Sequence, residues 1–289
     1  MDTITFLWAI AATITAGVQL FFSKIIAHEG RDAAFNGIMM YGLSGVMAAL
    51  ILIAHPWPKE WAIIGLLGLS SGAIHSFGNY IRIQSLKNID SVVYFPINKV
   101  LGPLVVVAAG VLWFGDPLVL RQYIGIALSL SVPLLLISAT EHHRQKNLRL
   151  GIVLLIQSTI LTSVSVLFSK EGLAHGRDVL FMIGASQLAG TMCSIAILYR
   201  QKGVRTMVSH IDKRDVLLGA LSGILAFFST YTLFEALSTG LISIVYVIQA
   251  HYILIPIVLA VWWYKEHINV RKALAIVVSL LAIGILYSA

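Results

Sequence analysis

Lys99 is the residue of this chain best placed to do chemistry, because it carries a charge deep inside a long apolar stretch. It lies about nine residues into that stretch, directly after Asn98. A charged side chain at membrane depth is costly and marks a candidate functional site, and a buried lysine can hold a carboxylate or phosphate as a point charge. We therefore expect Lys99 to face an internal cavity. A structural ion pair, or snorkelling of the lysine stem toward the interface, is the alternative.

His251 occupies nearly the matching position in a later apolar stretch. Asn98 and Gln249 align between the two stretches at an offset of 151, just before Lys99 and His251 respectively. Two polar pairs at equivalent depth could face each other across one central cavity. A lone histidine inside a membrane is about as often a hydrogen-bonded packing residue, so both interpretations of His251 stay open.

A third stretch carries His75, Asn79 and Arg82 at the spacing i, i+4, i+7. This spacing puts the three side chains on one face of a helix, which Gly68 and Gly72 continue. Such a stripe of small and polar residues either lines a water-filled cavity or packs closely against another helix. We expect His75, which is deep, to face a cavity, and Arg82, which is near the end of the stretch, to snorkel.

Three groups are candidates for proton coupling. His75 and His251 belong to the side-chain type that titrates near neutral pH. Glu235, near the end of the eighth apolar stretch, is either a proton-coupling carboxylate or a counter-ion for Lys99 or Arg82.

Uncharged polar residues complete the candidate site. For the glutamines Gln19, Gln157 and Gln187, hydrogen bonding between helices is as good an interpretation as substrate contact. The candidate substrate-binding residues are Lys99, His251, His75, Asn79, Asn98, Gln249, Tyr94, Tyr246, Gln19 and Gln157.

Membrane-spanning helices must position these residues. Hydrophobic residues make up 58% of the chain and charged residues 11%, with a mean hydropathy of +0.88, which excludes an ordinary soluble domain. A spanning helix needs roughly 20 largely apolar residues. The first apolar stretch is long enough to be retained as a helix rather than cleaved as a secretory signal. The chain offers ten spanning stretches, at about 4–26, 33–54, 60–82, 91–112, 118–138, 150–170, 179–199, 215–237, 241–262 and 270–287.

The basic residues indicate an orientation. A net charge of +7 could suggest nucleic acid, but Lys and Arg lie mostly in short loops beside helix ends, so no nucleic-acid partner is expected. The odd-numbered loops and their flanks hold 15 of these residues, and the even-numbered loops hold 4. The positive-inside rule then places the odd-numbered loops in the cytoplasm and both termini outside. The single cysteine, Cys193, excludes an intramolecular disulfide.

The chain repeats itself. Phe22-Ser23-Lys24 recurs 146 residues later as Phe168-Ser169-Lys170, and Asp116 recurs 150 residues later as Glu266. With five spans in each half, the second half enters the membrane from the opposite side, as in inverted-repeat transporters. We predict an all-α integral membrane protein of ten transmembrane helices in two inverted five-helix repeats. The predicted repeats are 1–140 and 150–289, joined by a linker loop at 141–149.

Prolines lie in the fourth span of both halves. We expect Pro96, Pro103 and Pro256 to be structural, because bilayers tolerate proline when neighbouring helices satisfy the freed backbone groups. Their placement suggests matched bends in the two halves.

Ten spans in two five-helix repeats resemble the drug/metabolite transporter superfamily, particularly its EamA-type branch. The resemblance is carried by the Phe-Ser-Lys ends of the two opening helices and by the acidic residue after each fourth helix, Asp116 and Glu266. Membership would imply a central cavity lined mainly by helices 1, 3, 4, 6, 8 and 9, alternating access, and export or exchange of a small organic solute. It would also make Asp116 and Glu266 structural, and would place both termini in the cytoplasm, opposite to the charge count.

The leading functional hypothesis is a secondary transporter for a small organic solute with an anionic group, coupled to protons or working by exchange. It rests on the excess of basic over acidic groups at depth: Lys99, His75 and His251 against Glu235 near one edge. An exporter of hydrophobic cations and a flippase for a lipid-linked intermediate are the alternatives within transport. A membrane enzyme is remote, because HExxH, P-loop and Rossmann glycine patterns are absent. We expect a monomer in the plasma (inner) membrane whose partners are the lipid bilayer and a small molecule, with no cofactor or metal.

Overall fold

The computed structural model describes residues 1–29, 33–53, 57–89, 91–136, 147–202, 212–264 and 269–288, and all regular structure in these ranges is helical. Nine apolar segments among them are long enough to cross a membrane, and α5 is a shorter apolar helix. The predicted all-α membrane fold is therefore confirmed. The first half contains α1 (Thr3–His28), α2 (Ala33–Ile53), α3 (Trp61–Leu86), α4 (Ser91–Leu112) and α5 (Leu120–Leu135). The second contains α6 (Leu148–Ala174), α7 (Val179–Lys202), α9 (Lys213–Thr239), α10 (Ile242–Ala250), the 3₁₀ turn η1 (His251–Ile253), α11 (Leu254–Tyr264) and α12 (Val270–Ser288).

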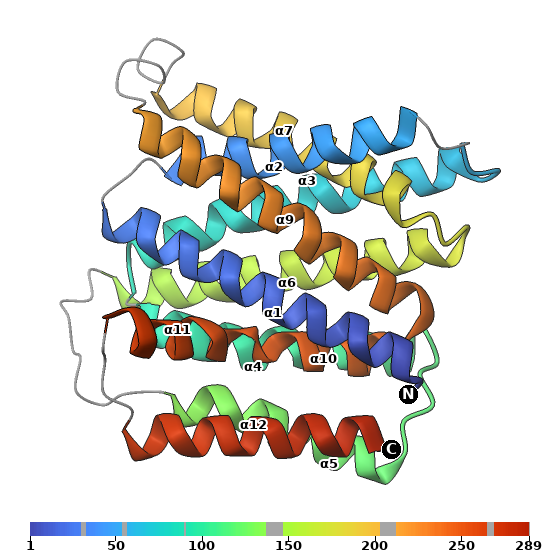
Figure 1. Ribbon diagram of the computed structural model, residues 1–289, viewed down its shortest axis with the longest axis vertical. Coiled ribbons are helices and arrows are strands. Elements are labelled where there is room, and N and C mark those ends of the chain that lie inside the picture. The colour runs from blue at the N-terminus through green and yellow to red at the C-terminus, as the bar shows by residue number, and fades with distance from the viewer. Residues whose placement is uncertain are drawn as a thin grey trace.

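The helices of the two halves pack reciprocally. α3 packs against α6 and α7, and its counterpart α9 packs against α1 and α2. The counterparts α5 and α12 pack against each other at one edge of the bundle, and both chain ends lie at the same end of it (Figure 1). Reciprocal contacts of this kind are what two inverted repeats produce.

Polar residues cap three helices where they begin. Asp2 accepts a hydrogen bond from the backbone N–H of Thr5 at 2.9 Å, at the start of α1. Asn147 caps α6 and Asp212 caps α9 in the same way. The hydrogen bonds from Thr5 hold the pKa of the Asp2 carboxyl below its usual value.

The ninth span differs from its counterpart in the first half. α4 is one helix in spite of Pro96 and Pro103, whereas the ninth span is divided into α10, η1 and α11. Pro256 explains the division, because it has no N–H to donate to the carbonyl of Tyr252 four residues earlier, and its ring crowds that carbonyl. The two halves thus do not share an interruption, while the matched bends that the sequence suggested stay a prediction. Glu266 and residues 141–146 of the predicted linker lie outside the described residues.

Two matched glycine pairs let the repeats approach closely. A Cβ added to Gly72 of α3 would lie 1.8 Å from the Ser186 carbonyl oxygen of α7. On α9, a Cβ at Gly223 would lie 2.9 Å from a backbone oxygen of α2. Gly68 and Gly219 lie one turn earlier on the same two helices. Small residues at this spacing are typical of helix interfaces in membranes, where they allow close backbone contact.

Replacing Gly72 with alanine should destabilise the protein by about 1–3 kcal/mol, the usual range for overpacking. The added methyl group would meet backbone, not a flexible side chain, so α3 or α7 must move. The melting temperature of the purified protein in detergent measures the effect. Gly284→Ala on α12 is the matched control, because no atom lies within 4 Å of its added Cβ. Equal melting temperatures for the two variants would contradict the tight contact between α3 and α7.

Candidate functional site

A cavity of about 250 Å³ lies inside the bundle, lined by both halves. Its walls come from α1, α2, α3, α6, α7, α9, α10 and η1. We refer to it as the central cavity. The residues expected from the sequence that line it are Gln19, His75, Asn79 and Gln249.

One face of α3 supplies the charged wall of the central cavity. His75, Asn79 and Arg82 all line it, as their spacing along the helix requires. Asn79 Nδ2 donates a hydrogen bond to Tyr41 Oη, and the His75 and Tyr41 rings meet edge to face with centroids 6.4 Å apart. Arg82 was expected to snorkel, but its side chain lines the cavity beside these groups.

The charge of Arg82 is not neutralised within the described part of the chain. There its guanidinium makes no hydrogen bond or ion pair, and the described residues that line the central cavity include no aspartate or glutamate. Removing a charge from water without a partner is unfavourable. The central cavity can therefore accept an anion at Arg82, which offers the planar donor fork that suits carboxylate or phosphate.

A second group without a partner lies on the α7 wall. Gln187 is 6% exposed, and its Oε1 has no hydrogen-bond donor among the described residues. The serines on the neighbouring wall are satisfied, since Ser71 Oγ lies 2.8 Å from Ser169 Oγ and 3.1 Å from Ser165 Oγ. An unpaired buried acceptor costs about 1–3 kcal/mol. Gln187 can recover that loss by accepting a hydrogen bond from a bound molecule.

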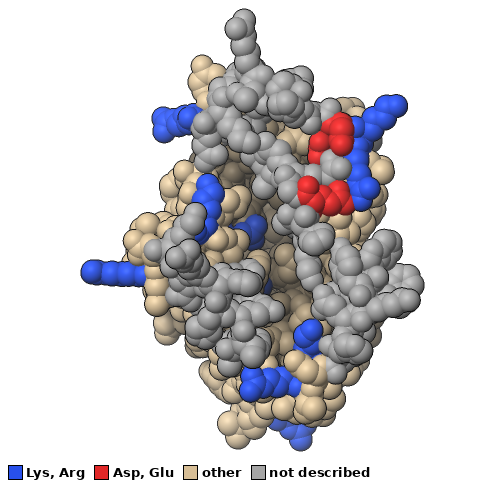
Figure 2. Space-filling view, turned by 90° about the vertical axis from the view of Figure 1, so that its left-hand side faces the viewer, with Lys and Arg blue, Asp and Glu red and all other residues tan. Residues whose placement is uncertain are grey.

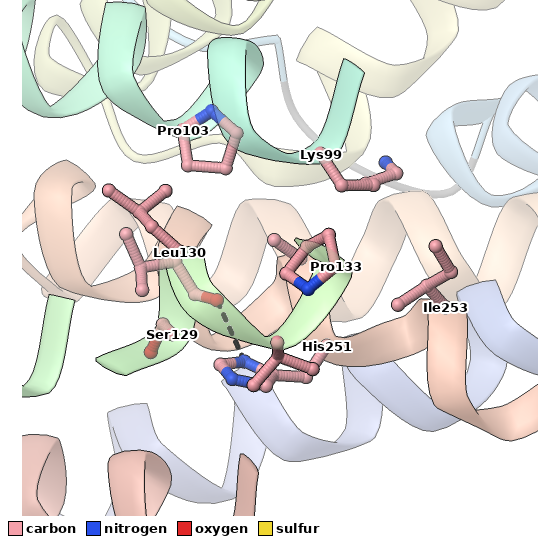
Figure 3. A pocket seen from close by; sticks show the side chains of 10 residues that line it. Lys99, Pro103, Ser129, Leu130, Pro133, His251 and Ile253 are labelled. Carbon is pink, nitrogen blue, oxygen red and sulfur yellow. Dashed lines mark hydrogen bonds between the residues drawn. The ribbon is translucent and has the colours of Figure 1, made fainter. Parts of the chain in front are cut away.

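The interruption of the ninth span places Tyr252 at the wall of the central cavity. Tyr252 lies in η1, and Lys99 of α4 donates a hydrogen bond to its Oη. Lys99 Nζ also lies 3.9 Å from the centroid of the Tyr252 ring, which is a cation–π contact. Lys99 is not among the lining residues of the central cavity. It lines a much smaller cavity, of about 10 Å³, between α4, α5 and the ninth span (Figure 3).

His251 faces this small cavity and not the central one. Its Nδ1 lies 3.0 Å from the Val247 carbonyl oxygen, so Nδ1 carries the proton, and Nε2 has no partner among the described residues (Figure 3). The small cavity is about large enough for one water molecule. Tyr246 of α10 lies beside Gly102 of α4 and does not line the central cavity either.

The remaining expected residues lie elsewhere on α4 and α6. Asn98 donates a hydrogen bond to Thr159 Oγ1 at 2.7 Å, and Tyr94 Oη lies 2.7 Å from Ser158 Oγ. Both contacts join α4 to α6 and do not point a polar group into the central cavity. Gln157 is exposed on the outer surface of α6, where it cannot contact a molecule in that cavity.

Asp116 lies outside the central cavity and joins the two halves. It is 7% exposed, and its Oδ2 accepts a hydrogen bond from the Ser243 backbone N–H at the start of α10, at 2.9 Å. Lys170 of α6 donates hydrogen bonds to the carbonyl oxygens of Leu237 and Gly240 at the end of α9, at 2.6 and 2.9 Å. The negative charge of Asp116 also acts on the Lys170 ammonium group. A carboxylate at a helix N-terminus and an ammonium at a C-terminus both stabilise the helix ends.

Glu235 is not the counter-ion that the sequence suggested. It interacts with the Tyr231 hydroxyl, one turn earlier on α9. Within the described residues it forms no ion pair with Lys99 or Arg82, and it lines neither cavity.

One face of the molecule gathers most of the described basic residues. Figure 2 shows this face, where α3 and α7 end and α6, α9 and α12 begin, with Lys and Arg spread around a central hollow and acidic residues confined to one part. Arg214 and Glu29 form an ion pair there. The other described basic residues at these helix ends are Lys87, Arg149, Arg200, Lys213, Arg271 and Lys272.

The sequence model of the EamA-like transporter family matches this chain twice, over residues 3–138 and 149–288. The chain belongs to the EamA-like transporter family. The resemblance seen in the repeats is thereby confirmed, and this EamA-like protein is a multi-pass integral membrane protein of a family that transports small molecules. No curated protein gives a significant match to the sequence.

Solved structures show the same fold. Significant matches include 29 chains. One of them, a crystal structure of a protein 14% identical in sequence, superposes with a TM-score of 0.78 over 99% of this chain and 96% of its own. At that identity the likeness concerns the fold alone.

Three residues that line the central cavity were not among the substrate-binding candidates chosen from the sequence, namely Arg82, Tyr252 and Gln187. Arg82 continues the face of His75, and Tyr252 stands four residues before Pro256, where an interrupted helix is expected. Gln187 carried the same signal as Gln19 and Gln157, a polar side chain inside an apolar span, but the sequence does not show which side of α7 faces the cavity.

Proposed function

We propose that this EamA-like protein is a secondary transporter that moves a small organic anion through the central cavity by alternating access. The Arg82 guanidinium carries the proposal, because it lines the cavity without a partner in the described residues. An anion in the cavity would supply the partner that this partly buried guanidinium lacks. A hydrophobic cation would find no carboxylate among the described lining residues, which favours the anion over the cation exporter.

The size of the central cavity favours a metabolite over a drug-sized molecule. Its volume of about 250 Å³ is below the roughly 300–1,000 Å³ that is usual for drug-sized ligands. The reciprocal packing of the repeats supports alternating access, in which one half rocks against the other around a fixed site. His75 is the candidate for proton coupling, because it is a titratable side chain that lines the cavity. Exchange of one anion for another is the alternative mechanism.

The basic face supports an orientation. We place the face in Figure 2 in the cytoplasm and both termini outside, because Lys and Arg gather on the cytoplasmic side of membrane proteins. In this proposal the protein acts as a monomer in the plasma (inner) membrane.

Thermal stabilisation of the purified protein tests the substrate class. A molecule that binds only the folded state raises its stability, by about 2.7 kcal/mol at 100 times its Kd. We expect lactate or benzoate to raise the melting temperature, and tetraphenylphosphonium, a hydrophobic cation, to leave it unchanged. Stabilisation by tetraphenylphosphonium and by neither carboxylate would overturn the proposal.

Replacing Gln187 with leucine should raise the stability of the ligand-free protein and weaken the binding of lactate. The substitution removes a buried acceptor whose missing hydrogen bond costs about 1–3 kcal/mol, and the lactate hydroxyl loses that acceptor. Benzoate has no hydroxyl, so its affinity should change less. Gln157→Leu makes the same chemical change on the outer surface and serves as the control. Equal lactate affinities in the two leucine variants would show that Gln187 does not contact the bound anion.

A further inference from the structure

Tyr252 has a hydroxyl hydrogen for which the described residues offer no acceptor. Lys99 Nζ donates to Tyr252 Oη, and an ammonium group has no lone pair with which to accept a hydrogen bond in return. The phenol hydrogen must therefore be donated elsewhere, and no described residue accepts it. Because Tyr252 lines the central cavity, a molecule inside that cavity is the acceptor within reach.

Lys99 is held by the Tyr252 ring and not by a carboxylate. Its Nζ lies 3.9 Å from the ring centroid, and no described aspartate or glutamate forms an ion pair with it. The hydrogen bond and the cation–π contact together fix the ring. The donated hydrogen bond also polarises the hydroxyl, since hydrogen bonds in a chain strengthen one another. Figure 3 shows Lys99 at the edge of the small cavity, which it lines together with residues of α5 and the ninth span.

Arg82 provides a second unsatisfied donor group near the first. It lines the same cavity, and its charge acts electrostatically on Tyr252. Arg82 belongs to α3 of the first half, and Tyr252 belongs to η1 of the second. The two donors thus approach one site from the two repeats.

We propose that Arg82 and the Tyr252 hydroxyl together bind one carboxylate group of the substrate, and that Lys99 is a positioning residue that acts through Tyr252. This inference rests on the proposed function. A carboxylate has two oxygens, one for the guanidinium and one for the hydroxyl, and both hydrogen bonds are charge-assisted. A second carboxylate would find no free cation, because the described lining residues offer no Lys or Arg other than Arg82. The substrate class is therefore the small monocarboxylates.

A double-mutant cycle tests the role of Lys99, with benzoate as the probe because its carboxylate is its one polar group. Tyr252→Phe keeps the ring and the cation–π contact but removes the hydroxyl, and should weaken benzoate binding roughly tenfold, the value of one charge-assisted hydrogen bond. Lys99→Met should weaken binding in the wild-type background. In the Tyr252→Phe background it should add less than about a twofold further loss, because Lys99 then has no hydroxyl to act through. Lys99→Arg, which keeps the charge and a donor, should recover most of the affinity that Lys99→Met loses.

Each result has a distinct meaning. Equal losses on Lys99→Met in both backgrounds would show that Lys99 contacts the anion itself, which overturns the positioning role. Wild-type benzoate affinity in Tyr252→Phe would overturn the Tyr252 contact. The melting temperatures of the ligand-free variants show that each is folded, and Tyr252→Phe, which keeps the ring, is the variant that perturbs the fold least. Failure of the proposed function would be seen in the wild-type protein, as stabilisation by tetraphenylphosphonium and not by a carboxylate.

Discussion

Replacing Arg82 with glutamine should weaken benzoate binding by roughly 10- to 100-fold, the value of a hydrogen bond to a charged group. Glutamine keeps a polar side chain of similar length but removes the positive charge and the planar fork of donors. The ligand-free protein should not lose stability, because the guanidinium has no partner to lose within the described residues. Titration of the melting temperature with benzoate measures both quantities in one series.

Arg149→Gln is the matched control for this prediction. Arg149 is exposed at the start of α6 on the same basic face, so its substitution removes the same charge at a distance from the cavity. A loss of affinity in Arg149→Gln equal to that in Arg82→Gln would mean that the general field of the basic face, and not a site at Arg82, attracts the anion.

Replacing Asp116 with alanine should lower the free energy of unfolding by about 3 kcal/mol, the upper end of the cost of leaving a buried polar group without its hydrogen-bond partner. The substitution leaves the Ser243 N–H without its acceptor, and Lys170 half-buried without the negative charge that acts on it. Because these groups join α4, α6 and the turn between α9 and α10, the loss should reduce the cooperativity between the two halves. Unfolding in mixed detergent micelles measures the change.

Asp178→Ala provides the comparison. Asp178 Oδ1 accepts a hydrogen bond from the Phe181 backbone N–H at 2.9 Å, so this carboxylate also caps a helix. Loss of an ordinary cap costs about 1 kcal/mol. If Asp178→Ala and Asp116→Ala destabilised the protein equally, Asp116 would be an ordinary cap and would not join the halves electrostatically.

The helical scaffold could be predicted, because the lengths of the apolar stretches and the duplicated motifs are visible in the sequence itself. Ten apolar stretches, the recurrence of Phe-Ser-Lys and the spacing of His75, Asn79 and Arg82 follow from the rules for helices in lipid, and the fold agrees with them. The rotation of each helix about its own axis could not be predicted in this way, because it depends on contacts between helices that are distant in sequence. Gln157 and Gln187 look alike in the sequence, yet one faces outward and the other lines the central cavity.

The same reason explains why the charged residues were harder to place. Lys99 lies inside the predicted fourth helix, but its partner is Tyr252, 153 residues later, and no local pattern indicates that contact. Arg82 lies near the end of its span, where snorkelling is the usual outcome. The end of α3 borders a cavity, so the guanidinium remains inside the bundle.

Counterflow in reconstituted vesicles tests most directly whether the central cavity carries organic anions across the membrane. Vesicles that contain the wild-type protein and are preloaded with unlabelled benzoate or lactate should transiently accumulate the same labelled anion from outside. Arg82→Gln vesicles should accumulate far less, and Arg149→Gln vesicles should match the wild type. Equal accumulation in the Arg82→Gln and wild-type vesicles, at similar protein content, would contradict the account.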